Sequence, residues 1–60
     1  MMQIYCFTWQ RPGRVDRANK PIIYKETLFN YTREGAIADF RKRHADELDG
    51  MIKFTCGKFR

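Results

Sequence analysis

Residues 2–9 (MQIYCFTW) form a strand-like run that is apolar on both of its sides. Successive residues of a β-strand point to opposite faces of a sheet. One side of this run carries Tyr5, Phe7 and Trp9. The other side carries Met2, Ile4 and Cys6. A chain of 60 residues with one helix covers only one face of a small sheet. The second face is therefore left for water, for another copy of the chain or for a partner.

The rest of the chain predicts a second strand, a helix and a third strand. Residues 21–31 are rich in β-branched and aromatic residues, and their imperfect alternation predicts a bulge near Lys25 and Glu26. Thr32 is a suitable N-cap for a helix from about residue 33 to about residue 48, where apolar residues recur at helical spacing. Gly50 suits the helix stop, and residues 51–59 alternate as a strand. The polar segment 10–20 is either a mobile arm or an extension of the first two strands.

This order predicts a single small α+β domain over residues 1–60, a ββαβ unit in which one helix lies on one face of a three-stranded, mainly antiparallel sheet. Strand order 2-1-3 is favoured because it places the most apolar strand in the centre, and order 1-2-3 is the alternative. The helix then covers Ile4, Cys6, Ile52 and Phe54, with Phe40 and Phe54 central in the core. The open side is lined by Tyr5, Phe7, Trp9, Lys53 and Thr55. The reverse assignment, with the aromatic residues under the helix, stays open.

Composition limits the classes of protein to which the chain belongs. A hydrophobic share of 43% and an aromatic share of 15% are typical of a folded domain. Two cysteines, Cys6 and Cys56, are too few for a disulfide scaffold, and with a single histidine they offer no zinc ligand set. No apolar run is long enough to cross a membrane, and the start lacks a signal-peptide pattern. We expect a complete cytoplasmic protein that binds no metal, no cofactor and no membrane.

The net charge of +5 is concentrated in two segments. Residues 10–20 hold four basic residues against one acidic residue, and residues 51–60 hold three basic residues and no acidic one. Topology brings the end of the helix, with Arg41, Lys42 and Arg43, to the same edge of the sheet as the first of these segments. A basic edge of this kind suits phosphates or an acidic protein surface. The same three cations also suit the negative end of the helix dipole, which is an equally good explanation for them.

Two sets of residues are candidates for binding a partner. The aromatic set with its neighbouring cation consists of Tyr5, Phe7, Trp9 and Lys53. The loop set consists of Arg11, Arg14, Arg17 and Lys20. Aromatic rings beside basic groups on a sheet stack on the bases of single-stranded nucleic acid, and Trp and Tyr are also favoured anchors in protein interfaces. The same rings equally suit a core or a dimer interface.

The sequence offers no catalytic set. His44 has no neighbouring nucleophile and acid, and we expect it to be packed or partly buried against the helix face. No Gly-rich phosphate loop, nucleophile elbow, zinc-protease motif or calcium loop is present in the sequence. We therefore expect no enzymatic activity.

Residues 21–28 (PIIYKETL), followed by an alanine-containing helix and a closing strand, resemble the layout of small phage-encoded proteins. Among these are phage inhibitors of bacterial RNA polymerase with a strand-strand-helix-strand plan. The resemblance covers about the C-terminal two-thirds of the chain and implies a protein that binds and blocks a host protein. The basic loop and the two-sided first strand depart from that layout, so no functional residue is carried over.

Together these patterns predict a small non-enzymatic accessory protein of phage or prophage type. We expect it to bind a larger macromolecule, favouring a host protein of the nucleic-acid machinery, through an open aromatic sheet face and a basic loop edge. One alternative is direct binding of nucleic acid by the basic loop with aromatic stacking. The other is a homodimer that buries the second sheet face.

Overall fold

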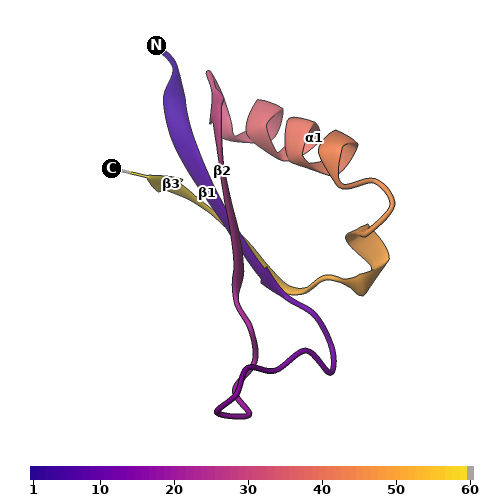
Figure 1. Cartoon of the computed structure of the whole chain (residues 1–60). Coiled ribbons are helices and arrows are strands. Elements are labelled where there is room, and N and C mark those ends of the chain that lie inside the picture. Colours follow the sequence, from indigo (N-terminus) through magenta and orange to yellow (C-terminus); the bar gives the residue numbers. More distant parts are fainter. Residues whose placement is uncertain (60) are drawn as a thin grey trace.

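The computed structural model describes residues 1–59; Arg60, counted above in the charge of the last segment, lies outside the described residues. The elements are β1 (Gln3–Gln10), β2 (Tyr24–Asn30), α1 (Arg33–Arg43), the 3-10 turn η1 (Leu48–Gly50) and β3 (Ile52–Phe59). The strands form one antiparallel sheet in the order β2-β1-β3, and α1 packs against one face of it (Figure 1). The predicted α+β class and the strand order 2-1-3 are confirmed.

The helix covers the aromatic side of β1, which makes the predicted face assignment wrong. Tyr5, Phe7 and Trp9 are 5%, 0% and 5% exposed, whereas Ile4 and Cys6 lie on the uncovered side and are only half-buried. The physical reason is size: α1 has 11 residues, and three aromatic rings bury much more apolar area beneath it than Ile4 and Cys6 would. Tyr5, Phe7 and Trp9 are therefore core residues and do not form an open binding face.

The core is an aromatic stack centred on Phe40 of α1. The Phe40 ring stacks on Phe7 at a centroid distance of 4.5 Å and meets Trp9 edge-on at 5.2 Å. Phe40 itself is fully buried, as predicted. Phe54 contacts the rings of Phe7 and Phe40 but is 42% exposed, so its predicted central place is wrong and it lies at the rim of the core.

The helix begins as predicted and ends earlier than predicted. Thr32 has an extended backbone, and its Oγ1 accepts a hydrogen bond from the Gly35 N–H at 3.0 Å. α1 then stops at Arg43, and the chain turns through His44 before reaching η1. Three basic residues in the last turn suit the helix dipole there, whereas the acidic residues from position 46 onward would oppose it if the helix continued.

The irregularity in the sheet lies on β3, not on β2. β1 and β2 pair without interruption from Gln3 opposite Asn30 to Trp9 opposite Tyr24, so the predicted bulge near residues 25–26 is wrong. The β1–β3 register shifts between Thr8 and Gln10, and Lys53 adopts a positive φ of 52° at the shift. This bulge moves Ile52, predicted under the helix, to the side of Gln10, because residues opposite each other in an antiparallel pair share a face.

Within residues 1–59, no helix is both long enough and apolar enough to cross a membrane.

Candidate macromolecule-binding surface

The sheet surface turned away from α1 is called the open face here. It is assembled by strand pairing from Ile4, Cys6, Thr8, Gln10, Lys25, Thr27, Phe29, Ile52, Thr55, Gly57 and Phe59. One row across it, the apolar row, has Ile4 in the centre between Phe29 and Phe59. The two rings are 61% and 55% exposed. Exposed aromatic rings on both sides of an isoleucine form a contiguous apolar strip, which is the kind of surface that contacts a partner.

The remainder of the open face carries little charge. In the next row, Cys6 lies between Thr27 and Gly57, and no atom lies within 4 Å of the position a Cβ would take at Gly57. In the row after that, Thr8 lies between Lys25 and Thr55, and the two threonine hydroxyls are hydrogen-bonded to each other. None of the eleven residues of the open face is acidic, so Lys25 gives it a positive charge.

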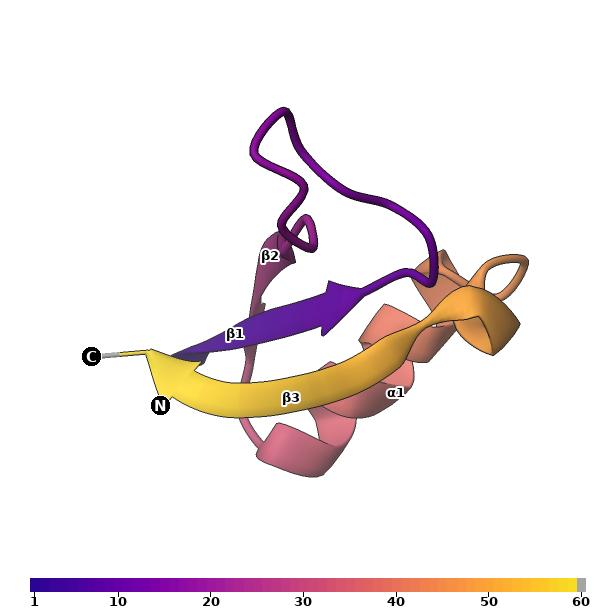
Figure 2. The same ribbon diagram turned by 90° about the horizontal axis from the view of Figure 1, so that it is seen from below.

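Residues 11–23, called the basic arm here, form a hairpin-like extension of β1 and β2. Its tip is held by Asp16, whose Oδ1 accepts hydrogen bonds from the N–H groups of Ala18 (2.9 Å) and Lys20 (3.0 Å). Val15 and Pro21 form an isolated bridge behind the tip. Figure 1 and Figure 2 both show the arm projecting away from α1. The arm thus has a defined turn and no regular strands, so β1 and β2 do not extend into it, which was one of the two predicted alternatives.

The four predicted arm cations fall into two groups. Arg14, Arg17 and Lys20 are exposed, and none of them forms an ion pair with residues 1–59. Arg11 is different, because its guanidinium pairs with Glu47 at 3.2 Å and lies 5.8 Å from the centre of the Tyr24 ring. Arg14, Arg17 and Lys20 therefore present free positive charge. Arg11 instead connects the base of the arm to the segment after α1.

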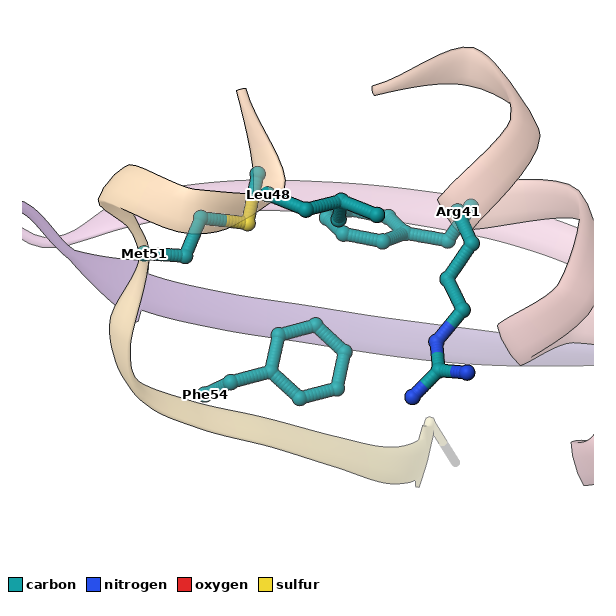
Figure 3. A pocket seen from close by; sticks show the side chains of 5 residues that line it. Arg41, Leu48, Met51 and Phe54 are labelled. Atoms are coloured by element: carbon teal, nitrogen blue, oxygen red, sulfur yellow. The ribbon is translucent and has the colours of Figure 1, made fainter. Parts of the chain in front are cut away.

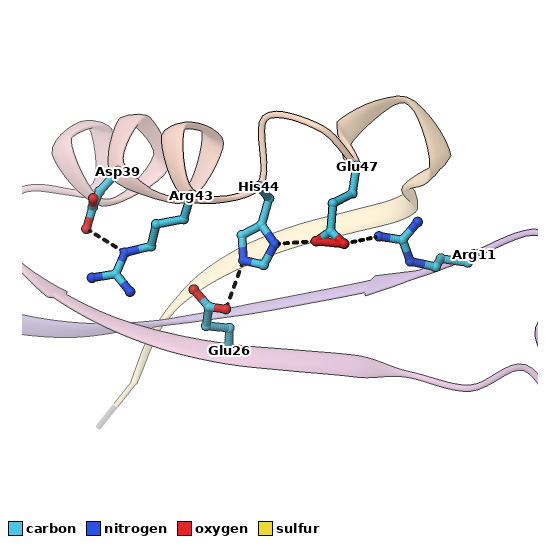
Figure 4. Close-up of polar contacts among 6 residues, drawn as sticks. All are labelled: Arg11, Glu26, Asp39, Arg43, His44 and Glu47. Atoms are coloured by element: carbon cyan, nitrogen blue, oxygen red, sulfur yellow. Dashed lines mark hydrogen bonds and ion pairs between the residues drawn. The ribbon is translucent and has the colours of Figure 1, made fainter.

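His44 links Glu47, the ion-pair partner of Arg11, to the sheet. Its Nε2 lies 2.8 Å from Glu26 Oε1 and its Nδ1 lies 2.6 Å from Glu47 Oε1 (Figure 4). Neutral imidazole has one N–H, so two carboxylate contacts require the doubly protonated ring. The hydrogen bond to Glu47 raises the pKa of His44, burial opposes this, and the hydrogen bond to Glu26 raises it further. The hydrogen bond between His44 and Glu47 also lowers the pKa of Glu47.

The packed position predicted for His44 is confirmed, because it is half-buried and its ring stacks on Phe40 at a centroid distance of 4.3 Å. Its pairing with two carboxylates was missed. Glu26 is 18 positions earlier in the chain, and only the registration of α1 over β2 brings the two side chains together.

No group of three or more His, Cys, Asp or Glu side chains among residues 1–59 is arranged to hold a metal ion. Both cysteines are free thiols, and they lie on opposite faces of the sheet because Cys6 pairs with Gly57 on the open face while Cys56 pairs with Phe7 on the helix side. The chemistry available at the open face is therefore apolar contact beside positive charge.

The sequence-predicted partner-binding residues are only partly assembled into one surface. Arg14, Arg17 and Lys20 are exposed together on the arm, and Lys53 is exposed in the β3 bulge, outside the regular alternation. The apolar row was missed. Its signal is the adjacent pair Leu28 and Phe29, which makes β2 apolar on both sides as β1 is and does not mark a bulge.

Comparison of the chain with models of protein families, with curated proteins and with solved structures gave no match.

Proposed function

We propose that this chain is a small non-enzymatic protein that docks on an acidic surface of a larger protein through its open face and basic arm. The observation that carries the proposal is the apolar row, in which the exposed rings of Phe29 and Phe59 flank Ile4 on a face that has Lys25 and no acidic residue. A patch of aromatic and aliphatic side chains next to basic groups fits a partner surface with an apolar centre and an acidic rim.

The size of the sheet supports a role for the arm in the same contact. Three strands about 4.8 Å apart and eight residues long cover roughly 400 Å². Stable protein interfaces bury about 800 Å² on each partner, so the sheet surface alone supplies about half of that area. The arm continues directly from β1 and β2 and carries Arg14, Arg17 and Lys20, which can extend the contact onto acidic groups of the partner.

Electrostatics favour a different protein over a second copy of this chain. Each copy has a net charge of +5, and a face-to-face dimer would bring Lys25 and the arm cations of two copies toward each other. Repulsion between like charges opposes that arrangement, whereas an acidic partner gains from the same charges.

Nucleic acid is the second candidate partner. The exposed arm cations Arg14, Arg17 and Lys20 favour it, since all three are available for phosphate contacts. The stacking platform proposed from sequence has no support, because Tyr5, Phe7 and Trp9 are buried. Binding of this kind would be electrostatic and would weaken steeply as salt is raised.

The resemblance noted above makes bacterial RNA polymerase the first purified partner to test. Binding is measured by co-sedimentation or by the amount of chain that binds to immobilised polymerase. Phe29→Asp and Phe59→Asp are the open-face variants, and Tyr31→Asp is the matched control. Tyr31 is 65% exposed and lies outside the sheet. We expect the open-face variants to lose binding, the control to keep it, and the triple change of Arg14, Arg17 and Lys20 to Ala mainly to slow association.

Two results would remove the proposal of a protein partner. One is equal binding by the open-face variants and the wild-type chain, for this or any other partner that is captured. The other is a mobility shift with oligonucleotides at about 0.15 M salt that disappears in the arm variant but persists in the open-face variants. That second result would establish nucleic acid as the partner.

A further inference from the structure

α1 covers the helix side of β3 only in part. β3 is exposed along its length except at Cys56, which is half-buried. On the helix side of this strand, Phe54 touches Phe7 and Phe40 yet remains 42% exposed. The core is therefore open between α1, η1 and β3, on the opposite side of the sheet from the open face.

A cavity of about 200 Å³ lies between α1, η1 and β3. Its lining consists of Phe40, Arg41, Leu48, Met51 and Phe54 (Figure 3). Four of these side chains are apolar and one is cationic. An apolar cavity of about 150 Å³ is large enough to bind benzene, so this one accommodates a single aromatic ring. It is smaller than the roughly 300–1,000 Å³ of sites for drug-sized ligands, which favours one inserted side chain over a whole small molecule.

Arg41 gives the cavity a specific charge requirement. Figure 3 shows its guanidinium beside the Phe54 ring at the edge of the cavity. Arg41 forms no ion pair with residues 1–59, whereas Arg43 in the same turn pairs with Asp39 at 3.5 Å. A free guanidinium beside an apolar cavity is suited to a carboxylate next to an apolar group, because its paired N–H groups match the two oxygens.

The side of α1 that faces β3 extends this pattern along the helix. Arg33, Ile37 and Arg41 are spaced four residues apart and therefore share that side. The Arg33 guanidinium donates hydrogen bonds to the Cys56 carbonyl at 3.3 and 3.4 Å, which places it over β3. The cavity together with Arg33 and Ile37 on this side of α1 is called the groove here, and basic residues lie at two levels along it.

We propose that this groove binds an extended acidic segment of a partner protein, which inserts one aromatic ring into the cavity and places a neighbouring carboxylate on Arg41. The groove is distinct from the open face, so the proposal does not depend on the function proposed above and each can fail alone. Ring insertion would cover the exposed edge of Phe54 and complete the core at β3.

The test uses the full chain and the capped peptide Asp-Glu-Phe-Asp-Glu, followed by two-dimensional NMR. We expect shifts at the amides of Leu48, Met51 and Phe54 and none along the apolar row. A peptide with Ala in place of Phe and a peptide with Lys in place of each acidic residue should leave the spectrum unchanged. Shifts confined to the apolar row would overturn the proposal, and so would equal binding by either control peptide or by phenylacetate alone.

Two variants of equal net charge test the role of Arg41. Arg41→Gln should weaken peptide binding about tenfold, because a charge-assisted hydrogen bond is lost. Lys42→Gln is the matched control, since Lys42 is exposed on the adjacent position and does not line the cavity. It should change binding less than about twofold. Equal effects of the two variants would show non-specific attraction and would overturn the assignment of Arg41.

Discussion

His44 is the residue whose chemistry the fold changes most. Alone on a helix it would be an ordinary surface histidine, but the packing of α1 over β2 gives each ring nitrogen a carboxylate partner. Glu47 is further held by Arg11, so four side chains link the start of the arm, the sheet and the segment after α1 (Figure 4). The positive charge of His44 is therefore part of the folded structure.

This arrangement predicts that the free energy of unfolding decreases as pH rises above about 6.5. The hydrogen bond to Glu47 holds the pKa of folded His44 above its ordinary value of 6.5, so the pairing stabilises fully below about pH 6.5 and is lost as pH rises through the folded value. The lowered pKa of Glu47 acts at the other end, and its contribution is lost as pH falls through a value below 4.5. Thermal unfolding followed from about pH 5 to pH 9 should show Tm declining above pH 6.5.

His44→Gln provides the control for this prediction. The variant cannot titrate in this range, so its Tm should change much less over the same interval. A wild-type Tm that stays level or rises from about pH 6.5 to pH 8.5 would contradict the assignment of His44 as a paired cation.

At the level of elements, the sequence was enough to predict the three strands, the helix and the strand order. Those depend on residue spacing and on the rule that the most apolar strand is central. The side covered by α1 could not be predicted, because both sides of β1 are apolar and only the fit of Phe40 against Phe7 and Trp9 decides between them. The end of α1 and the β3 bulge depend on tertiary contacts in the same way.

Packing of α1 on the sheet depends on one side chain to an unusual degree. Phe40 is fully buried and contacts Phe7, Trp9, His44 and Phe54. We expect Phe40→Ala to lower the free energy of unfolding by roughly 3–5 kcal/mol, which is enough to unfold most chains of this size. The measurement is chemical or thermal denaturation followed by circular dichroism.

Phe59→Ala is the matched control for Phe40→Ala, since Phe59 is 55% exposed on the open face. It should change the free energy of unfolding by no more than about 0.5 kcal/mol. If Phe40→Ala melts near the wild type, or if the two variants are equally destabilised, α1 does not pack on the sheet as described.

The molecule as a whole has two layers, and its acidic and basic residues are distributed unevenly between the two sides of the sheet. Its extents of 41 × 26 × 13 Å leave room for one sheet and one helix in the thin direction. Apart from Asp16 in the arm, the acidic residues lie on the helix side of β2 or in the segment 34–49. One side of the sheet therefore presents mixed charges, and the other presents apolar and basic groups.

This distribution of charge predicts that self-association increases as the salt concentration is raised. At low ionic strength the net charge of +5 should keep copies apart despite the exposed apolar row. At about 1 M salt screening extends only about 3 Å, and apolar contact between open faces should then produce dimers. Sedimentation at increasing NaCl concentration checks this, with Phe59→Asp expected to stay monomeric throughout. A dimer at low salt that dissociates as salt rises would contradict it.

The placement of Cys6 and Cys56 on opposite faces gives the chain two natural reporters. Cys6 lies beside the apolar row, and Cys56 lies on the helix side of β3 near the groove. Alkylation kinetics of the two thiols would therefore identify which surface a bound partner occupies. Slower modification of Cys6 alone would mark a ligand on the open face, and slower modification of Cys56 alone would mark one between α1 and β3, with no residue of the chain replaced.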